Sequence, residues 1–598
     1  MKVISRATRA LFAVLLIFLP CFSVCQTAAQ TAKAQTATYA VSIQRNVAAK
    51  MRDGVTLRAD IYRPIAEGTF PVLLERTPYD KTNGTEFGMK AAARGYVFVI
   101  QDTRGRYASD GEFYTFKNET NDGYDTVEWA AALPYANGKV GMVGGSYVGA
   151  TQFLAAVARP PHLSGIAPYV TASNYHDGWT YQGGAFEQWF NQSWSSGLAE
   201  NTLFRAAGKT SNAMNYKDGL PLTDYPMFIV PDLKALAPYY RDWLAHPNYD
   251  EYWKQLSIEE RYSQIQVPVF NIAAWYDIFL GGSLRNYQLL KTKAGSDAAR
   301  TGQKLLVGIG GHAGGWEREE IGAVNFGKNA PFDGDEAVLQ WYDHLLKGEQ
   351  NAMASSKPVR IFVMGKNVWR DEDDWPLARA KATKYFLHSS GGANSVRGNG
   401  TLDTKSPDSE PKDSYLYDPA NPVPTIGGPL CCDPTHLKPG PFDQTTAEAR
   451  NDVLVYSTPA FTNDLEVTGP VTLELYVGTS AVDTDFTAKL VDVWPNGFAQ
   501  NLTEGILRLR YRSSQEKPDL AKPGEIYRIA VDLWATSNVF LAGHKLRLEI
   551  SSSNFPRFDR NLNTGEDQAT GTKMLKATNA IYHDKEHPSA LVLPVVPE

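Results

Sequence analysis

The stretch G-K-V-G-M-V-G-G-S-Y-V-G-A-T-Q, residues 138–152, predicts how this chain folds. Its apolar run 140–143 is typical of a buried strand, and residues 150–159 are compatible with a helix. Ser146 lies between the two, with glycines on both sides. A serine in a sharp turn between strand and helix is the context that a nucleophile elbow requires, and glycines permit close backbone approach there. An ordinary Gly-rich turn has the same composition, so other parts of the chain must decide between these interpretations.

Strands and helices alternate on both sides of this stretch. Upstream, residues 43–64 indicate a β-hairpin with Asp53-Gly54 at its turn. The pattern also predicts strands at 71–74, 96–101, 165–170, 267–275, 304–309 and 359–364, and helices at 121–133, 283–290 and 335–346. Alternation at this spacing predicts parallel βαβ units in one α/β domain.

Two later regions differ in composition. Residues 173–262 are rich in Trp and Tyr, carry helical patterns, and predict a helical cap inserted into the α/β domain. Beyond Trp375, short strands alternate with Gly, Pro, Asn and Asp turns, which predicts an all-β sandwich or jelly roll. We therefore expect an α/β domain at 40–375, interrupted by the cap, and a jelly-roll domain at 380–598.

The N-terminal residues 1–34 have the pattern of a cleaved signal peptide followed by a polar linker. Lys2, Arg6 and Arg9 form a basic start, and the apolar run 10–24 is short for a bilayer span. Cleavage fits after residue 29 or 34, and lipid attachment at Cys25 is an alternative with a poor flanking sequence. We expect a periplasmic or secreted protein.

Overall charge limits the partners of the chain. The 598 residues carry a formal net charge of -6, with a pI near 6.0. Nucleic acids and anionic membranes bind basic patches, so we expect neither as a partner beyond the export signal. A small-molecule partner is expected instead, and the sequence has no signal for the oligomeric state.

Only two cysteines, Cys431 and Cys432, remain after removal of the signal segment. An oxidising compartment permits a disulfide, yet a bond between sequence neighbours closes almost no loop. Two reduced or partly buried thiols are at least as good an interpretation. A metal site is not expected, because His436 is the only nearby soft ligand.

Partners for the serine follow two later strands. A serine hydroxyl needs a histidine base, and the histidine needs an acid that orients it. Ser146, Asp277 and His312 occur in the order serine, acid, histidine, and each directly follows a predicted strand. The remaining nine of the 10 histidines precede the acid or lie in the cap, in a helix or in the β domain. We therefore predict a catalytic triad.

An oxyanion intermediate would need two preorganised donors. The backbone N–H of Tyr147, directly after the serine, is the first candidate. The second should come from the loop after an early strand, where the Tyr79 hydroxyl is available. The alternative is that the Tyr79 ring only packs.

Longer motifs resemble the CocE/NonD hydrolases, a cocaine-esterase-like family related to X-Pro dipeptidyl peptidases. The matching segments cover nearly all of the chain after the signal segment: D-G-V-T-L-R-A-D-I-Y-R-P (53–64), R-T-P-Y-D-K (76–81), Q-D-T-R-G-R (101–106), G-G-S-Y-V-G (144–149), A-W-Y-D (274–277), F-T-A-K-L-V-D-V (486–493), L-W-A-T-S-N-V-F (533–540) and S-S-S-N-F-P-R-F-D-R-N (551–561). The resemblance implies an α/β-hydrolase domain with a helical cap and a C-terminal jelly roll. It implies the triad and the Tyr79 donor named above, and no cofactor or metal.

The chain departs from the family near the acid and the histidine. The family often has G-P-W-x-H, whereas this chain has G-I-G-G-H at 308–312. Ile278-Phe279-Leu280 follows the acid instead of the acidic pair of α-amino-acid ester hydrolases, so that specificity is not supported. Phe279 matches a position that lines an aromatic acyl pocket in cocaine-esterase-like enzymes, and we assign Trp275 to the same pocket.

The function expected is that of an exported serine hydrolase, which cleaves an ester or amide through an acyl-enzyme. An X-Pro dipeptidyl aminopeptidase is the first alternative, although no single cap carboxylate stands out to hold a peptide amino terminus. A carbohydrate-binding or adhesive protein, acting through residues 380–598, is a more distant alternative.

Overall fold

The computed structural model describes residues 38–597 except 208–220, 222, 224–235 and 313, so the predicted signal segment and part of the cap lie outside the described residues. Ten strands form the first sheet in the order β1-β2-β4-β3-β5-β6-β9-β10-β13-β14. They are β1 (Val41–Lys50), β2 (Thr56–Pro64), β3 (Phe70–Thr77), β4 (Val97–Asp102), β5 (Ala136–Gly145), β6 (Leu163–Tyr169), β9 (Phe270–Tyr276), β10 (Lys304–Gly311), β13 (Val359–Val363) and β14 (Val368–Glu372). All pairs from β4 to β13 are parallel, as the alternation predicts, and the β1–β2 hairpin is antiparallel.

One strand of this sheet was missed by the sequence pattern. β14 pairs antiparallel with β13 at the edge of the sheet, beyond the strand expected to be last. Its sequence V-W-R-D-E is mostly polar and only its last residue is fully buried. A charged edge strand has no apolar run to reveal it, although its charges discourage pairing with other chains.

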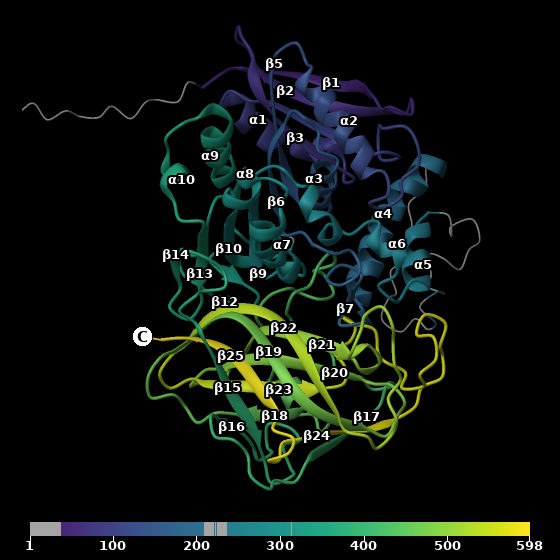
Figure 1. The fold of residues 1–598 in the computed structure, drawn as a ribbon, viewed down its shortest axis with the longest axis vertical. Coiled ribbons are helices and arrows are strands. Elements are labelled where there is room, and N and C mark those ends of the chain that lie inside the picture. The colour runs from purple at the N-terminus through teal and green to yellow at the C-terminus, as the bar shows by residue number, and fades with distance from the viewer. Residues whose placement is uncertain (1–37, 208–220, 222, 224–235, 313, 598) are drawn as a thin grey trace, which may run out of the picture. The chain divides into compact units, whose positions relative to one another are not determined.

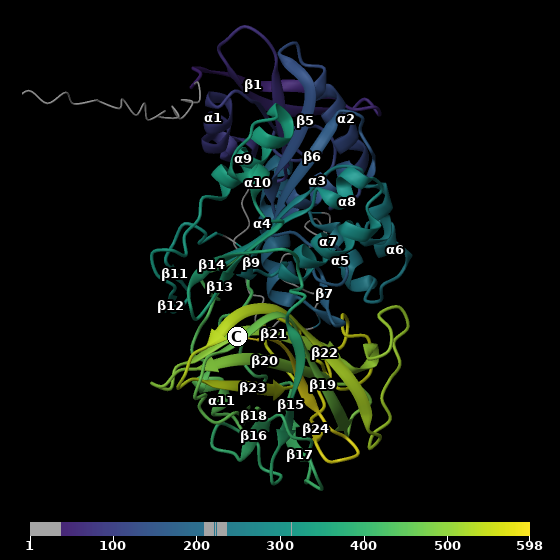
Figure 2. The ribbon, with the colours of Figure 1, turned by 60° about the vertical axis from the view of Figure 1, so that its left-hand side comes forward.

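Helices cover both faces of the sheet, and residue alternation decides which face each side chain meets. Phe98 and Ile100 of β4 pack with α1 (Thr85–Ala93) and α9 (Gly334–Lys347). Val97 and Val99 of the same strand pack with α2 (Glu119–Ala131) and α3 (Tyr147–Val157). Figure 2 shows α1 and α9 on one side of β5 and α2 on the other. The other elements of this domain are η1 (Lys81–Gly84), α7 (Leu280–Lys293), α8 (Asp297–Thr301), β11 (Glu320–Ile321), β12 (Val324–Asn325) and α10 (Ala352–Ser355).

The region predicted as a cap is helical, with one small addition. Its helices are α4 (Gln188–Ala207), α5 (Pro238–Ala245), α6 (Glu251–Lys254) and η5 (Glu259–Gln264). Before α4, the short strands β7 (Tyr181–Gln182) and β8 (Ala185–Phe186) form a hairpin. Its turn residue Gly183 has φ +54°, and a Cβ there would lie 2.0 Å from the Ile506 carbonyl oxygen. The hairpin therefore fits tightly against the β domain. Among the described helices, none has the length and apolar character that crossing a bilayer requires.

The C-terminal β domain is built on an 11-stranded sheet, drawn in green to yellow in Figure 1. Its elements are β15 (Lys381–His388), β16 (Gly400–Asp403), β17 (Asp413–Tyr417), α11 (Thr445–Glu448), β18 (Leu454–Ser457), β19 (Leu465–Thr479), β20 (Asp485–Val493), β21 (Ala499–Arg508), η6 (Leu509–Tyr511), β22 (Tyr527–Phe540), β23 (Lys545–Ser551), β24 (Ala577–Tyr582) and β25 (Ala590–Val596). β21 was not predicted, because its buried residues include Gln, Asn, Thr and Glu. Gln500 bonds Tyr276 of the first sheet, whereas Asn501, Thr503 and Glu504 bond partners within the β domain.

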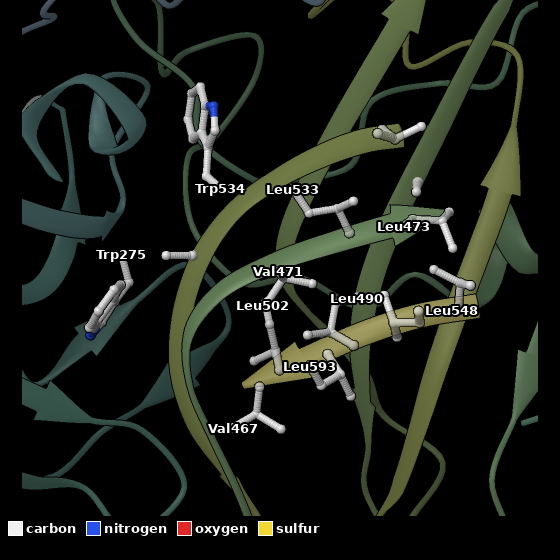
Figure 3. Close-up of a cluster of buried hydrophobic side chains, with 14 of the residues drawn as sticks. Trp275, Val467, Val471, Leu473, Leu490, Leu502, Leu533, Trp534, Leu548 and Leu593 are labelled. Carbon is white, nitrogen blue, oxygen red and sulfur yellow. The ribbon is translucent and has the colours of Figure 1, made fainter. Parts of the chain in front are cut away.

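One hydrophobic cluster joins this sheet to the α/β domain. It contains Leu473, Leu490 and Leu548 of the β domain together with Trp275 and Ile361 of the first sheet (Figure 3). The chain connections agree, since Met364 and Ser537 or Val539 exchange backbone hydrogen bonds of 2.9 Å. The two sheets therefore share a hydrophobic core, and backbone hydrogen bonds also connect them.

Candidate active site

Ser146 stands in a constrained turn between β5 and α3. Its backbone has φ 61° and ψ -127°, a conformation that residues with a Cβ rarely adopt. Gly144 makes the turn possible, because a Cβ there would lie 2.3 Å from Val148 Cγ1. The Ser146 carbonyl accepts a hydrogen bond from Thr171 Oγ1 at 2.8 Å, which ties the turn to the residues after β6. The Ser146 side chain is held partly open at the end of its strand.

His312 and Asp277 lie beside this serine. His312 Nε2 is 2.7 Å from Ser146 Oγ, and His312 Nδ1 is 2.7 Å from Asp277 Oδ1. Asp277 is fully buried and accepts a further bond of 3.0 Å from the Phe279 N–H. Each of the three residues directly follows a parallel strand, β5, β9 or β10, so all three lie at one edge of the sheet. The arrangement can pass a proton from the hydroxyl to an oriented imidazole.

The loop of His312 is shaped by glycine and by the β domain. Gly310 has φ +123°, a conformation that glycine adopts without strain. A Cβ on Gly311 would lie 3.2 Å from Pro439 Cβ of the β domain. The departure from the family pattern at 308–312 therefore coincides with a contact that residues 380–598 supply.

The Tyr79 hydroxyl lies beside Ser146. It accepts a hydrogen bond of 2.9 Å from Trp194 Nε1 of α4. Burial raises its pKa above the ordinary value of 10, although hydrogen bonds with Trp194, Ser146 and the Tyr147 N–H act in the opposite direction. The phenol therefore stays protonated at neutral pH, within hydrogen-bond reach of the serine and of the Tyr147 N–H.

The Tyr147 side chain points away from the serine. Its hydroxyl donates to Glu119 Oε1 at 3.1 Å and accepts from the Phe116 N–H at 2.7 Å. Glu119 forms a buried ion pair of 2.7 Å with Arg76. The sequence analysis singled out none of these partners nor Trp194, although Arg76 lies in a quoted motif. Their proximity depends on the packing of α2, α3 and α4 around the turn.

Aromatic side chains surround the imidazole. The Phe279 ring meets His312 edge to face at 4.9 Å and stacks on Trp179 at 4.3 Å. Phe190 of α4 meets Phe279 at 5.4 Å. Phe279 is therefore fully buried beside the imidazole, and the cap supplies its aromatic neighbours.

Trp275 lies elsewhere, which corrects its assignment to this pocket. Its indole N–H donates to the Phe362 carbonyl at 2.7 Å, and its ring contacts Trp375 at 5.8 Å. Figure 3 shows it at the margin of the core shared with the β domain. Every residue of β9 is buried, so the sequence pattern had no information on which way this side chain points.

A buried acid of the cap lies near this region. Glu187 is fully buried, and among the described residues neither of its carboxyl oxygens has a hydrogen-bond partner. Arg557 of the β domain lies 3.9 Å away and bonds Gln182 and Glu504. Burial raises the pKa of Glu187 to about 8, and the charge of Asp277 contributes in the same direction. The sequence pattern did not distinguish this glutamate from surface acids.

The adjacent cysteines Cys431 and Cys432 are joined by a disulfide. From the sequence, two reduced or partly buried thiols are at least as good an interpretation as this bond. In the described part of the chain, no cluster of three or more His, Cys, Asp or Glu residues could hold a metal ion.

Comparison with known proteins identifies relatives over most of the chain. Residues 53–314 match the family described as X-Pro dipeptidyl-peptidase (S15 family), and residues 351–592 match the X-Pro dipeptidyl-peptidase C-terminal non-catalytic domain. Cocaine esterase from Rhodococcus sp. (strain MB1 Bresler) is 41% identical over 585 residues, which cover 93% of this chain and 99% of that protein. These relatives are hydrolases, which disfavours the carbohydrate-binding alternative.

Two solved structures are similar in fold. An aminopeptidase from a marine sediment archaeon, Thaumarchaeota archaeon, superposes with a TM-score of 0.79 and 24% identity, covering 95% of this chain and 98% of that chain. An α-amino acid ester hydrolase superposes with a TM-score of 0.78 and 24% identity, covering 96% and 100% of the two chains. The arrangement of an α/β-hydrolase type domain with a C-terminal β domain is thus shared.

Proposed function

Because the chain belongs to the CocE/NonD family of serine hydrolases, we propose that it cleaves an ester or amide through an acyl-enzyme on Ser146. The observation that carries this proposal is the pair of 2.7 Å contacts linking Ser146 Oγ, His312 and Asp277. His312 takes the serine proton as the hydroxyl attacks the carbonyl carbon, and later returns it to the leaving group. Asp277 orients the imidazole and stabilises its charged form.

The negative oxygen of the tetrahedral intermediate would lie between two donors. The Tyr79 hydroxyl lies within hydrogen-bond reach of Ser146 and of the Tyr147 N–H, and the bond from Trp194 Nε1 orients the phenol. Donors held in place before the reaction stabilise the transition state without reorganisation. Water then attacks the acyl-enzyme, with His312 acting as the base.

The acyl group is proposed to be apolar and aromatic or bulky. Phe279 and Trp179 form a stacked pair directly beside the imidazole, and the Phe190 ring contacts Phe279 edge to face. Offset and edge-to-face contacts with aromatic rings favour an aromatic acyl group over a charged one.

Activity across a panel of esters and amides tests this proposal. We expect hydrolysis of phenyl esters with benzoyl and acetyl groups, with the benzoyl ester having the lower KM. An aryl fluorophosphonate should label Ser146, and Ser146→Ala should remove both labelling and turnover. Turnover that survives in this variant would contradict the assignment of the nucleophile.

The same panel separates an esterase from an X-Pro dipeptidyl aminopeptidase. A peptidase of that kind needs a carboxylate that is free for the substrate ammonium group. Glu187 is a buried acid of the cap, but Arg557 lies 3.9 Å from it and it has no exposed surface. We therefore expect an X-Pro anilide to be a much poorer substrate than a phenyl ester.

Export is part of the proposal. Residues 1–34 have the basic start and apolar run of a signal peptide. In a bacterial host, the full chain should accumulate in the periplasm or medium in a form shortened by the signal segment. Lys2→Glu with Arg6→Glu should retain it in the cytoplasm, and N-terminal sequencing of the exported form identifies the cleavage site.

A further inference from the structure

A loop of the β domain reaches into the α/β domain beside the proposed site. Residues 428–440, here called the cysteine loop, are closed at their base by two backbone hydrogen bonds between Gly428 and Gly440, of 2.8 and 2.9 Å. Pro439 of this loop packs against Gly311, the residue before His312. The base of the loop therefore touches the segment that carries the imidazole.

The opposite end of the loop touches the cap. The His436 ring contacts Trp189 of α4 at 6.3 Å, and His436 Nδ1 is 2.7 Å from Asp433 within the loop. Trp189 directly precedes Phe190, which contacts Phe279 of the proposed acyl pocket. The cysteine loop therefore bridges the His312 segment and the cap helix that bears the pocket aromatics.

The two cysteines differ in burial, and only Cys431 enters the core. Cys431 is only 4% exposed and, with Leu430, belongs to the hydrophobic cluster that contains Phe279, Trp179 and Phe190. This cluster is otherwise formed almost entirely by the α/β domain and the cap. Cys432, in contrast, is exposed. One sulfur of the disulfide therefore belongs to the packed core, and the residue of the other is open to solvent.

We propose that the Cys431–Cys432 disulfide is a thiol-exchange site, whose reduction by a dithiol loosens the cysteine loop and weakens binding of bulky acyl groups. The proposal deepens the proposed function and rests on it. Its reactant is any small dithiol or dithiol protein that reaches Cys432.

The exchange balances as a two-electron transfer from the dithiol. A thiolate of the reductant attacks the Cys432 sulfur, the Cys431–Cys432 bond breaks, and Cys431 leaves as a thiolate that takes a proton. The second thiol of the reductant then attacks its own sulfur in the mixed disulfide and releases Cys432. The products are two protein thiols and one cyclic disulfide of the reductant.

Reduction changes the loop more than the whole protein. A bond between neighbouring residues closes almost no loop in the unfolded chain, so global stability should change little. The same bond removes rotational freedom from the two residues, and its loss allows the loop more conformations. The loop touches both the His312 segment and α4. Greater freedom of the loop should therefore weaken the binding of large acyl groups and raise their KM.

The test uses the chain from Thr38 onward, which is one compact unit and contains only these two cysteines. Steady-state kinetics with benzoyl and acetyl phenyl esters are measured before and after treatment with dithiothreitol. Alkylation with iodoacetamide and mass spectrometry count the free thiols in each sample. We expect reduction to raise the benzoyl KM roughly fivefold, equivalent to about 1 kcal/mol, with little change for acetyl.

Cys432→Ser is the matched control, because it removes the bond at the exposed position and leaves the buried Cys431 in place. Before any treatment it should show the raised benzoyl KM expected of the dithiothreitol-treated enzyme, and it should not respond to dithiothreitol. Its melting temperature should be unchanged. Hydrogen exchange of residues 428–440 gives a readout that needs no catalysis, and it should become faster on reduction.

Three results would overturn the proposal: full reduction with unchanged benzoyl KM and unchanged exchange, two free thiols in the untreated enzyme, or a disulfide that dithiothreitol cannot reach in the folded chain. Failure of the proposed function would look different. In that case Ser146 would escape fluorophosphonate labelling and both esters would remain intact, while hydrogen exchange would still report on the loop.

Discussion

The loops at the strand ends and the interface between the cap and the β domain differ in how far their polar groups are exposed to solvent. At the strand ends, Ser146, Asp277 and His312 form a chain of short contacts that leaves the serine partly open. At the interface, Arg557 and Glu187 are both about 1% exposed or less, and Arg557 also bonds Glu504 and Gln182. A serine hydroxyl is thus left partly open in one region, and charge is enclosed in the other.

This difference teaches which substitutions should change chemistry and which should change stability. The strand-end residues are supported by backbone geometry, so their side chains can be replaced without loss of the fold. The enclosed charges compensate one another, so removing one partner leaves the other buried without its counter-charge. Four substitutions test this contrast.

The largest effect is expected at the nucleophile. Ser146→Ala should lower kcat by about 10⁶-fold, because the triad acts as a unit. The melting temperature should stay within a degree or two, or rise, since the strained φ of 61° at this turn is unchanged. Single-turnover kinetics and calorimetry check both parts. A large loss of stability would mean that the hydroxyl also supports the fold.

The second effect should appear only in stability. Arg557→Met should reduce the free energy of unfolding by about 3–5 kcal/mol, because Glu504 loses its buried counter-charge. Chemical denaturation measures this value. Lys254→Met is the matched control, since its ion pair with Glu516 also joins the cap to the β domain but is largely exposed. A change of at most about 1 kcal/mol is expected there, and equal losses would refute the contrast.

A third substitution tests the second oxyanion donor. Tyr79→Phe keeps the ring and removes the hydroxyl, and should lower kcat by about 10² to 10³ with little change in KM. Trp194→Phe removes only the bond of 2.9 Å that orients this hydroxyl and should cost less. Unchanged kcat in Tyr79→Phe would leave the Tyr147 N–H to act without this partner.

The last effect concerns the pH dependence of stability. The pKa of Glu187 rises from 4.5 to about 8 in the folded chain, mainly through burial. Between these values the folded protein keeps a proton that the unfolded chain has released. Glu187 therefore contributes full stability below pH 4.5, and this contribution falls as pH rises toward 8, by at most about 1.4 kcal/mol per pH unit.

Glu187→Gln should remove this slope, so the difference in stability between variant and wild type should grow in favour of the variant from pH 5 to pH 8. Denaturation curves at several pH values measure it. Glu67→Gln, at an exposed position, should follow the wild type at each pH. Parallel curves for Glu187→Gln and wild type would mean that Arg557 keeps the carboxyl ionised.

The candidate triad could be predicted from the sequence because each of its residues is marked by a short local pattern. Each residue directly follows an apolar run, and parallel strands of one sheet end at the same edge. Trp275 shows the limit of this reasoning, since it lies two residues before Asp277 yet its side chain points into another core. A strand buried on both faces has no polar alternation from which to assign direction.

Contacts between distant segments were not accessible in the same way. Trp194 and Tyr79 are 115 residues apart, and Arg557 and Gln182 are 375 apart. No local pattern marks such pairs, because their residue types are common and their meeting depends on how the cap packs on the β domain. The neighbours of His312 from the cysteine loop belong to this group.

The order of amino acids thus specified the parallel sheet, the turn at Ser146 and the three residues at its edge, because each depends on a few consecutive residues and on strand geometry. Folding settled the remainder: the donor that orients Tyr79, the direction of Trp275, the enclosed charges around Arg557, and the contact of Pro439 with Gly311. These depend on side chains from separate segments that pack together only when the cap and the β domain close around the sheet edge, and packing of that kind leaves no periodic trace in the sequence.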